Sequence, residues 1–275
     1  MFNKKRFVFD NIPDLSGKVA IVTGGNNGIG FITVRELVRK NARVFIASPE
    51  TFLAKNLPLH ILINNAGIMA TAFETTQDGI QDQFGVNHLG HFLFTNLLLP
   101  TIKASAPSRI VNISSVAHQN TPPAGIEFDK LNDPNAHTAF IRYGQSKLAN
   151  ILFTIELDKR LSGTNVYCNS VHPGVIKSDL WNGFYSSWGS WIKPFLNVLK
   201  LFMITPEEGA LTQLYCATSP EIEEKNHCAK YFVPYGELGK TTAQAKDEEL
   251  AKQLWDYSEK LVKEKLGDDV FSTDG

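Results

Sequence analysis

Short apolar runs alternate with longer stretches of helical periodicity from Lys18 onward. The apolar runs are rich in valine and isoleucine, which is typical of strands buried on both faces. They predict strands at 18–22, 43–47, 60–63, 109–113 and 165–171, and a late strand at 230–234. The stretches with helical periodicity predict helices at 29–40, 78–99, 143–161, 206–217 and, with one charged face, 247–265. Repeated strand–helix units predict an α/β fold with a doubly wound parallel sheet.

Composition narrows the class of protein. With 43% apolar residues and no linker rich in proline, glycine or serine, residues 1–275 are expected to form one domain. The net charge of −1 predicts no nucleic-acid partner. Three cysteines without CxxC spacing predict neither a disulfide framework nor a metal site, and suit a reducing compartment. No run reaches the roughly 18 apolar residues of a transmembrane span. We therefore expect a cytoplasmic protein.

A glycine-rich segment at 23–30, with the sequence TGGNNGIG, directly follows the first predicted strand and opens the first helix. Glycines in this context allow a tight turn and a close approach of the backbone to a pyrophosphate, which the helix N-terminus attracts. The alternative is an ordinary strand–helix turn. The position between a clear strand and a clear helix favours nucleotide binding.

Two further segments lie at the carboxyl ends of predicted strands, where such sheets bind ligands. Asn64-Asn65-Ala66-Gly67 offers small and amide side chains beside which a cofactor can pass, although an Asx turn is the alternative. Ser114-Ser115 offers a hydroxyl that can donate to a carbonyl oxygen, with turn capping as the alternative.

Tyr143 and Lys147 stand four residues apart on a predicted helix and so share one face. A neighbouring ammonium favours phenolate over phenol, so we expect Lys147 to lower the pKa of Tyr143. Such a tyrosine is a credible general acid and base for interconverting a hydroxyl and a carbonyl. Alone, the spacing is common and usually marks a solvated helix face.

Together and in this order, the four segments resemble the short-chain dehydrogenase/reductase family over residues 15 to 239. The surrounding sequences at 14–18, 86–92 and 146–150 are most similar to its retinol-dehydrogenase-like branch. The resemblance implies a single Rossmann-type domain that binds a nicotinamide cofactor, with a variable substrate loop at 179–204. By the same resemblance, the catalytic residues are Asn87, Ser115, Tyr143 and Lys147. The implied cofactor-binding residues are Gly24, Asn26, Asn27, Gly28, Ile29, Gly30, Asn65, Ala66, Gly67, Tyr143, Lys147, Pro173, Gly174 and Ser178.

The chain departs from the family pattern at 48–59, where twelve residues connect two predicted strands. A helix, a strand and a second helix would need at least about 25 residues, so we expect one strand and its flanking helix to be absent relative to the family. Pro49 stands about where NADP-using relatives carry an arginine. Glu50 would suit the ribose hydroxyls of NAD, unless it is an ordinary first-turn helix residue. We expect NADP(H) rather than NAD(H).

The segment 180–204 is rich in aromatic residues and poor in charge. A lid over a lipophilic substrate, plain core packing and an interfacial helix at a membrane surface are the alternatives, in that order. His88 and His91 are expected to be ordinary helix or core histidines rather than metal ligands. His172 is expected to pack in the core or to support the residues that contact the ligand. The resemblance also implies a homo-oligomer.

These observations predict an NAD(P)-dependent oxidoreductase that interconverts a lipophilic alcohol and its aldehyde or ketone. The alternative is a catalytically impaired relative that acts as a binding or interaction protein, because its adenine pocket is truncated.

Overall fold

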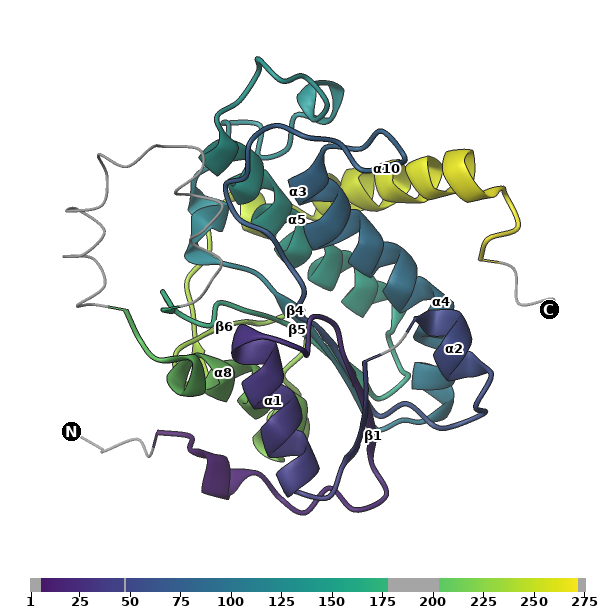
Figure 1. Ribbon diagram of the computed structural model, residues 1–275, viewed down its shortest axis with the longest axis vertical. Helices are drawn as coiled ribbons and strands as arrows, with labels where there is room; N and C mark the ends of the chain where they lie inside the picture. The colour runs from purple at the N-terminus through teal and green to yellow at the C-terminus, as the bar shows by residue number, and fades with distance from the viewer. Residues whose placement is uncertain (1–5, 47, 178–202, 272–275) are drawn as a thin grey trace.

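The computed structural model describes residues 6–46, 48–177 and 203–271 (Figure 1). A seven-stranded sheet in the order β2-β1-β3-β4-β5-β6-β7 lies at the centre. All neighbouring strands are parallel except β6 and β7. The strands are β1 (Val19–Val22), β2 (Arg43–Phe45), β3 (Ile61–Asn64), β4 (Ser108–Ile113), β5 (Val166–Val171), β6 (Tyr231–Val233) and β7 (Glu237–Leu238). The predicted doubly wound parallel sheet is confirmed.

Two helical layers cover the sheet (Figure 1). Helices α1 and α8 pack together on one face, where Ala20 and Val22 of β1 join their core cluster. Helices α4, α5 and α10 cover the other face, where Val19 and Ile21 join a second cluster. The alternation explains why β1 is apolar at every position. The helices are α1 (Gly28–Arg39), α2 (Pro49–Leu53), α3 (Asp82–Phe84), α4 (Gly90–Ala104), α5 (Ala139–Arg160), α8 (Pro206–Thr218), α9 (Glu221–Glu224) and α10 (Glu248–Leu266).

The chain reverses direction across the sheet at β1, because β2 pairs with one side of it and β3 with the other. Such a switch point leaves a crevice at the carboxyl ends of the strands, where ligands of open α/β sheets bind. The fold therefore gathers the segments that follow β1, β3, β4 and β5 at one edge of the sheet.

The connection from β2 to β3 contains the short helix α2, and β2 forms the edge of the described sheet. The Ser48 hydroxyl accepts a hydrogen bond from the Thr51 N–H and caps α2. Phe52 is fully buried and packs edge-on against Phe45, with ring centroids 5.2 Å apart. The connection is thus a single short crossover with its own apolar anchor. The absence of a strand relative to the family stays a prediction.

The helix predicted at 78–99 differs from the observed structure. It comprises α3, a π-helical turn at Gly85–Leu89 and α4. Helix α4 also continues past Pro100, because Leu98 and Ile102, one turn apart, are both buried against the core. Helix α5 begins four residues before Tyr143, at a cap formed by the Thr138 hydroxyl.

Candidate active site

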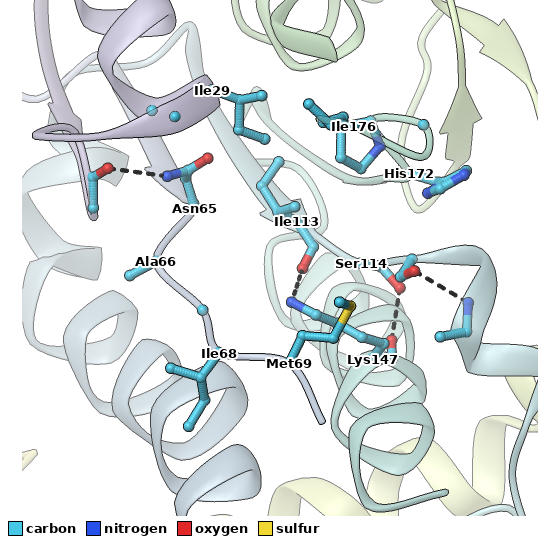
Figure 2. Close-up of a pocket in the computed structure, with 18 of the residues that line it drawn as sticks. Ile29, Asn65, Ala66, Ile68, Met69, Ile113, Ser114, Lys147, His172 and Ile176 are labelled. Carbon is cyan, nitrogen blue, oxygen red and sulfur yellow. Dashed lines mark hydrogen bonds between the residues drawn. The ribbon is translucent and has the colours of Figure 1, made fainter. Parts of the chain in front are cut away.

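The carboxyl ends of β1, β3, β4 and β5 border one cavity of about 390 Å³ (Figure 2). It brings together residues far apart in the sequence. The predicted site residues that line it are Gly24, Asn26, Asn27, Gly28, Ile29, Gly30, Asn65, Ala66, Gly67, Ser115, Tyr143, Lys147, Pro173 and Gly174. Asn87 lies behind the lining. Ser178 and most of the predicted substrate loop lie outside the described residues.

The glycine loop between β1 and α1 is shaped by close backbone contacts. Gly24 has a φ of +63°, a conformation that side chains rarely adopt. A Cβ atom on Gly30 would lie 2.2 Å from the carbonyl oxygen of Gly24, so no larger residue fits without moving the backbone. The Asn27 side chain caps α1 by accepting a hydrogen bond of 2.7 Å from Gly28 N–H. Gly28, Ile29 and Gly30 all line the cavity, so the N-terminus of α1 borders it. Helix N-termini favour anions through their N–H groups.

Thr23, at the end of β1, joins this loop to the segment after β3. Its hydroxyl oxygen accepts hydrogen bonds from the N–H groups of Asn65 and Ala66, at 2.8 and 2.9 Å. In return, the Asn65 side chain donates to the carbonyl oxygen of Thr23 at 2.9 Å. Thr23 belongs to the predicted glycine-rich segment, but this role was not predicted. A hydroxyl at the carboxyl end of the first strand was the available signal.

Asn87 lies in the π-helical turn, fully buried, and its side chain holds the backbone of Ile68 at both polar groups. The Asn87 amide oxygen accepts from the Ile68 N–H at 2.8 Å, and the amide nitrogen donates to the Ile68 carbonyl at 2.9 Å. The amide nitrogen also donates to the Ser146 hydroxyl, at 2.9 Å. Asn87 thus positions a segment that lines the cavity, and the segment includes Gly67.

Lys147 reaches the cavity from α5 and is 4% exposed. Figure 2 shows its ammonium beside the carbonyl of Ile113, to which it donates at 3.1 Å. The Ser114 hydroxyl donates to the Lys147 carbonyl at 2.7 Å and so fixes this turn of α5 against the end of β4. Burial lowers the pKa of Lys147 to about 8. The ammonium is therefore still the main form at neutral pH.

Tyr143 lies one turn before Lys147, and the ammonium nitrogen is 5.6 Å from the centroid of its ring. The expected lowering of the Tyr143 pKa is wrong for this structure. Burial raises that pKa to about 12, although a hydrogen bond with the Ser115 side chain opposes the rise. The cost of placing a phenolate in a buried site is the physical reason. Tyr143 is therefore a phenol at neutral pH.

Ser115 caps a short 3₁₀ turn at Val116–Gln119, and its hydroxyl oxygen accepts from the Ala117 N–H at 3.1 Å. The cap holds the Ser115 side chain on the cavity side, next to Tyr143. The hydroxyls of Ser115 and Tyr143 can therefore both donate a hydrogen bond to one oxygen atom of a ligand.

Apolar side chains line much of the cavity, and the backbone around Gly174 shapes one side of it. Gly174 has a φ of +103°, and a Cβ atom there would lie 2.5 Å from the Ile204 side chain. Ile204 also pairs with Ile176 in an isolated parallel bridge. The apolar side chains that line the cavity include Ile68, Met69, Val116, Phe140, Val175 and Ile176. His172, expected to be a packing or supporting residue, also lines it, and burial lowers its pKa to about 4.

The chain is similar to known oxidoreductases over nearly its whole length. It is 37% identical to an uncharacterized oxidoreductase of Schizosaccharomyces pombe, over 95% of this chain and 90% of that protein. It is 39% identical to retinol dehydrogenase 11 of Homo sapiens, over 89% of this chain and 85% of that protein. The short chain dehydrogenase model matches residues 50–128. This chain belongs to the short-chain dehydrogenase family.

A solved structure shares this fold. The crystal structure of an uncharacterized protein from Mycobacterium paratuberculosis has a TM-score of 0.73 and 29% identity, covering 94% of this chain and 98% of that chain. The predicted family and its retinol-dehydrogenase-like branch are confirmed. The chain is an oxidoreductase that acts on CH–OH or C=O groups, and the family implies a nicotinamide cofactor. Among residues 6–46, 48–177 and 203–271, no helix is long and apolar enough to cross a membrane.

Proposed function

We propose that this domain interconverts a lipophilic alcohol and its aldehyde or ketone, with Tyr143 and Lys147 as the acid–base pair. The observation that carries the proposal is the shared cavity. The phenol, the ammonium and the Ser115 hydroxyl line the same space as the glycine loop. A hydroxyl–carbonyl conversion that uses a dinucleotide needs a site for the pyrophosphate and a proton donor beside the reacting oxygen.

The residues present fit a nicotinamide dinucleotide. The N-terminus of α1 and the loop at Gly24 and Gly28 would hold the pyrophosphate, since both glycines have positive φ and leave the backbone accessible. Lys147 would bind the ribose hydroxyls next to the nicotinamide. Pro173 and Gly174, which also line the cavity, would contact the carboxamide. When bound, the nicotinamide supplies or accepts the hydride.

The side chains then handle the proton. In reduction, the carbonyl carbon gains a hydride and its oxygen gains the proton of the Tyr143 hydroxyl, so that an alcohol forms. Ser115 donates a hydrogen bond to the same oxygen and stabilises the negative charge that develops there. The Lys147 ammonium stabilises the tyrosinate until a solvent proton replaces the one lost. Oxidation of the alcohol reverses each step.

The apolar wall favours a lipophilic substrate. Met69 and Phe140 pack in one apolar cluster with Tyr143. Figure 2 shows Ile68 and Met69 across the cavity from Ile176. A retinoid, a steroid or a long-chain aldehyde would bury its hydrocarbon part there. The names of the relatives favour the retinoid. The carbonyl end would lie at Ser115 and Tyr143.

The finer expectations stay predictions. NADP(H) is preferred over NAD(H) in this proposal, and Glu50, which would repel a 2′-phosphate, is an exposed first-turn residue of α2 outside the cavity lining. A cytoplasmic location, peripheral contact with a membrane and a homo-oligomeric state complete the proposal.

Binding and turnover assays test the function together. The fluorescence of NADPH and NADH is titrated with the purified chain, and retinal and a series of straight-chain aldehydes are then assayed with the better donor. Saturable binding with turnover that increases with chain length supports the proposal. A folded, monodisperse chain that binds neither donor would instead support the alternative of a non-catalytic interaction protein.

A further inference from the structure

His91 lies on the first turn of α4, 5% exposed, between two parts of the candidate site. Its ring atom Nε2 is 2.9 Å from the Thr23 hydroxyl oxygen. Its other ring nitrogen, Nδ1, is 3.1 Å from the carbonyl oxygen of Asn87. One imidazole thus bridges the end of β1 and the π-helical turn that carries Asn87.

The hydrogen atoms of this bridge can be assigned from the partners. The Asn87 carbonyl can only accept, so the Nδ1 atom of His91 must carry the proton. The Thr23 hydroxyl oxygen already accepts from two N–H groups, those of Asn65 and Ala66. Its own hydrogen is therefore directed to Nε2 of His91, which is closer than the Ile63 carbonyl at 3.5 Å. Both ends require the same neutral tautomer, and burial keeps the pKa of His91 at about 4.

Each end of the bridge continues into the cavity. At one end, Thr23 fixes Asn65 and Ala66, which line the wall beside the glycine loop. At the other end, the Asn87 side chain fixes Ile68, and its amide oxygen would be 3.0 Å from a Cβ atom on Gly67. The Lys147 ammonium would be 3.4 Å from that same Cβ position. A displacement of either end is therefore transmitted to groups that contact the cavity.

We propose that His91 is a positioning residue that couples the glycine loop, where the cofactor would bind, to the arrangement of Asn87 and Lys147. This inference rests on the proposed function and deepens it. Cofactor binding and the geometry for proton transfer would then be linked through the bond between Thr23 and His91, so that weakening this bond impairs both.

Three substitutions of His91 distinguish the contributions of its two hydrogen bonds. His91→Gln places an amide near the position of Nε2 and keeps an acceptor for Thr23. His91→Asn places an amide near Nδ1 and keeps only the bond to the Asn87 carbonyl. His91→Leu removes both. Losing one buried hydrogen bond costs up to about tenfold in rate, so we expect kcat to fall about tenfold in His91→Asn and His91→Leu.

The same two variants should show a several-fold higher Kd for NADPH and an unchanged KM for the aldehyde. His91→Gln should restore kcat to within about threefold of the wild type, because the acceptor for Thr23 is retained. Ser258→Ala is the matched control: it removes the 2.8 Å bond from the other buried histidine of this segment, His88, to α10. It should lower the melting temperature and leave kcat and Kd unchanged.

A measurement on the unmodified chain does not depend on the folding of any variant. Isotope-labelled histidine gives NMR signals for both ring nitrogens of His91. We expect the neutral tautomer with the proton on Nδ1, and a change in the Nε2 signal when NADP⁺ saturates the protein. The His88 signals should stay fixed.

The outcomes are distinguishable. If no nicotinamide cofactor binds, the proposed function is wrong. If the cofactor binds while the His91 signals do not change, the coupling is wrong and the function stands. The coupling is also overturned if His91→Asn and His91→Gln have the same kcat, or if Ser258→Ala lowers kcat as much as His91→Asn does.

Discussion

The segments on the two sides of β1 differ in how their polar side chains form hydrogen bonds. On the β3 side, buried hydroxyl, amide and imidazole groups are joined by short hydrogen bonds, and each bond holds a part of the cavity wall. On the β2 side, Ile46 follows the end of β2 and is 56% exposed. The Ser48 hydroxyl accepts a hydrogen bond from the Thr51 N–H and so caps α2, which is a local contact. Residue identity is therefore tightly constrained on the first side and loosely on the second. We expect substitutions to affect the two sides very differently.

Tyr143→Phe should give the largest effect on the constrained side. The substitution removes the proton donor and almost nothing else from a buried ring, so turnover should fall about a thousandfold while the melting temperature changes little. Steady-state kinetics and an NADPH titration check this. A variant with normal turnover would remove Tyr143 from the mechanism, and a variant that no longer binds NADPH would give Tyr143 a role in binding.

Gly30→Ala should come second. The added methyl group would lie 2.2 Å from the Gly24 carbonyl oxygen, so the backbone must move to relieve the clash. We expect the free energy of unfolding to fall by about 1–3 kcal/mol. Chemical denaturation measures the loss, and the Kd for NADPH should rise in parallel. Gly90→Ala is the control. Gly90 has helical backbone angles, and its added Cβ would lie 3.3 Å from the Gly85 carbonyl oxygen, a tight contact that a shift of a few tenths of an ångström relieves. Its loss of stability should therefore be smaller than that of Gly30→Ala, and the Kd for NADPH should stay near the wild-type value.

The pH dependence of cofactor binding should show a smaller change. Lys147 holds its proton below a pKa of about 8 and loses it as the pH rises through that value. The charge that attracts the ribose oxygens is then lost, so Kd for NADPH should rise about tenfold between pH 7 and pH 9. A pH series of titrations measures it. In Lys147→Met the affinity should be weaker and nearly flat over the same range.

Ile46→Arg should give the smallest effect, and it tests the loosely constrained side. The end of the second strand is where dinucleotide-binding folds recognise the 2′ position of the adenosine ribose. A guanidinium in this exposed place should raise the ratio of NADPH to NADH affinity by about fivefold, as for an exposed ion pair. Ile46→Gln, which is polar and uncharged, should leave the ratio unchanged. If both variants change the ratio equally, charge recognition at this edge is wrong.

The sequence predicted the sheet well because β1 is apolar at every position, and β3 and β4 each contain a run of buried valine, isoleucine or leucine residues. It also predicted most of the cavity lining, since the glycine loop and the pair Tyr143 and Lys147 are local patterns. The role of Thr23 and the bridge through His91 depend on contacts between distant segments. The spacing of apolar and polar residues along the sequence carries no information about such contacts.

Two errors have the same physical origin. The rise in the Tyr143 pKa comes from burial by the surrounding elements, whereas the sequence shows only the neighbouring Lys147. The π-helical turn is invisible to a search for helical periodicity, and tertiary hydrogen bonds hold its Asn87 side chain on Ile68. In each case the local pattern was correct, and long-range packing changed its consequence.

The π-helical turn at Gly85–Leu89 has a consequence for how this segment can vary. Such a turn holds one residue more than the regular helix on either side of it. Deleting a residue there would let α3 and α4 join as one continuous helix, but would rotate one part against the other by about 100°. The side-chain amide of Asn87 would then point away from the backbone of Ile68, although the helix itself would become more regular. The irregular turn therefore determines the direction in which the Asn87 side chain points. A segment shorter by one residue would be more regularly helical and would lose the hydrogen bonds to Ile68.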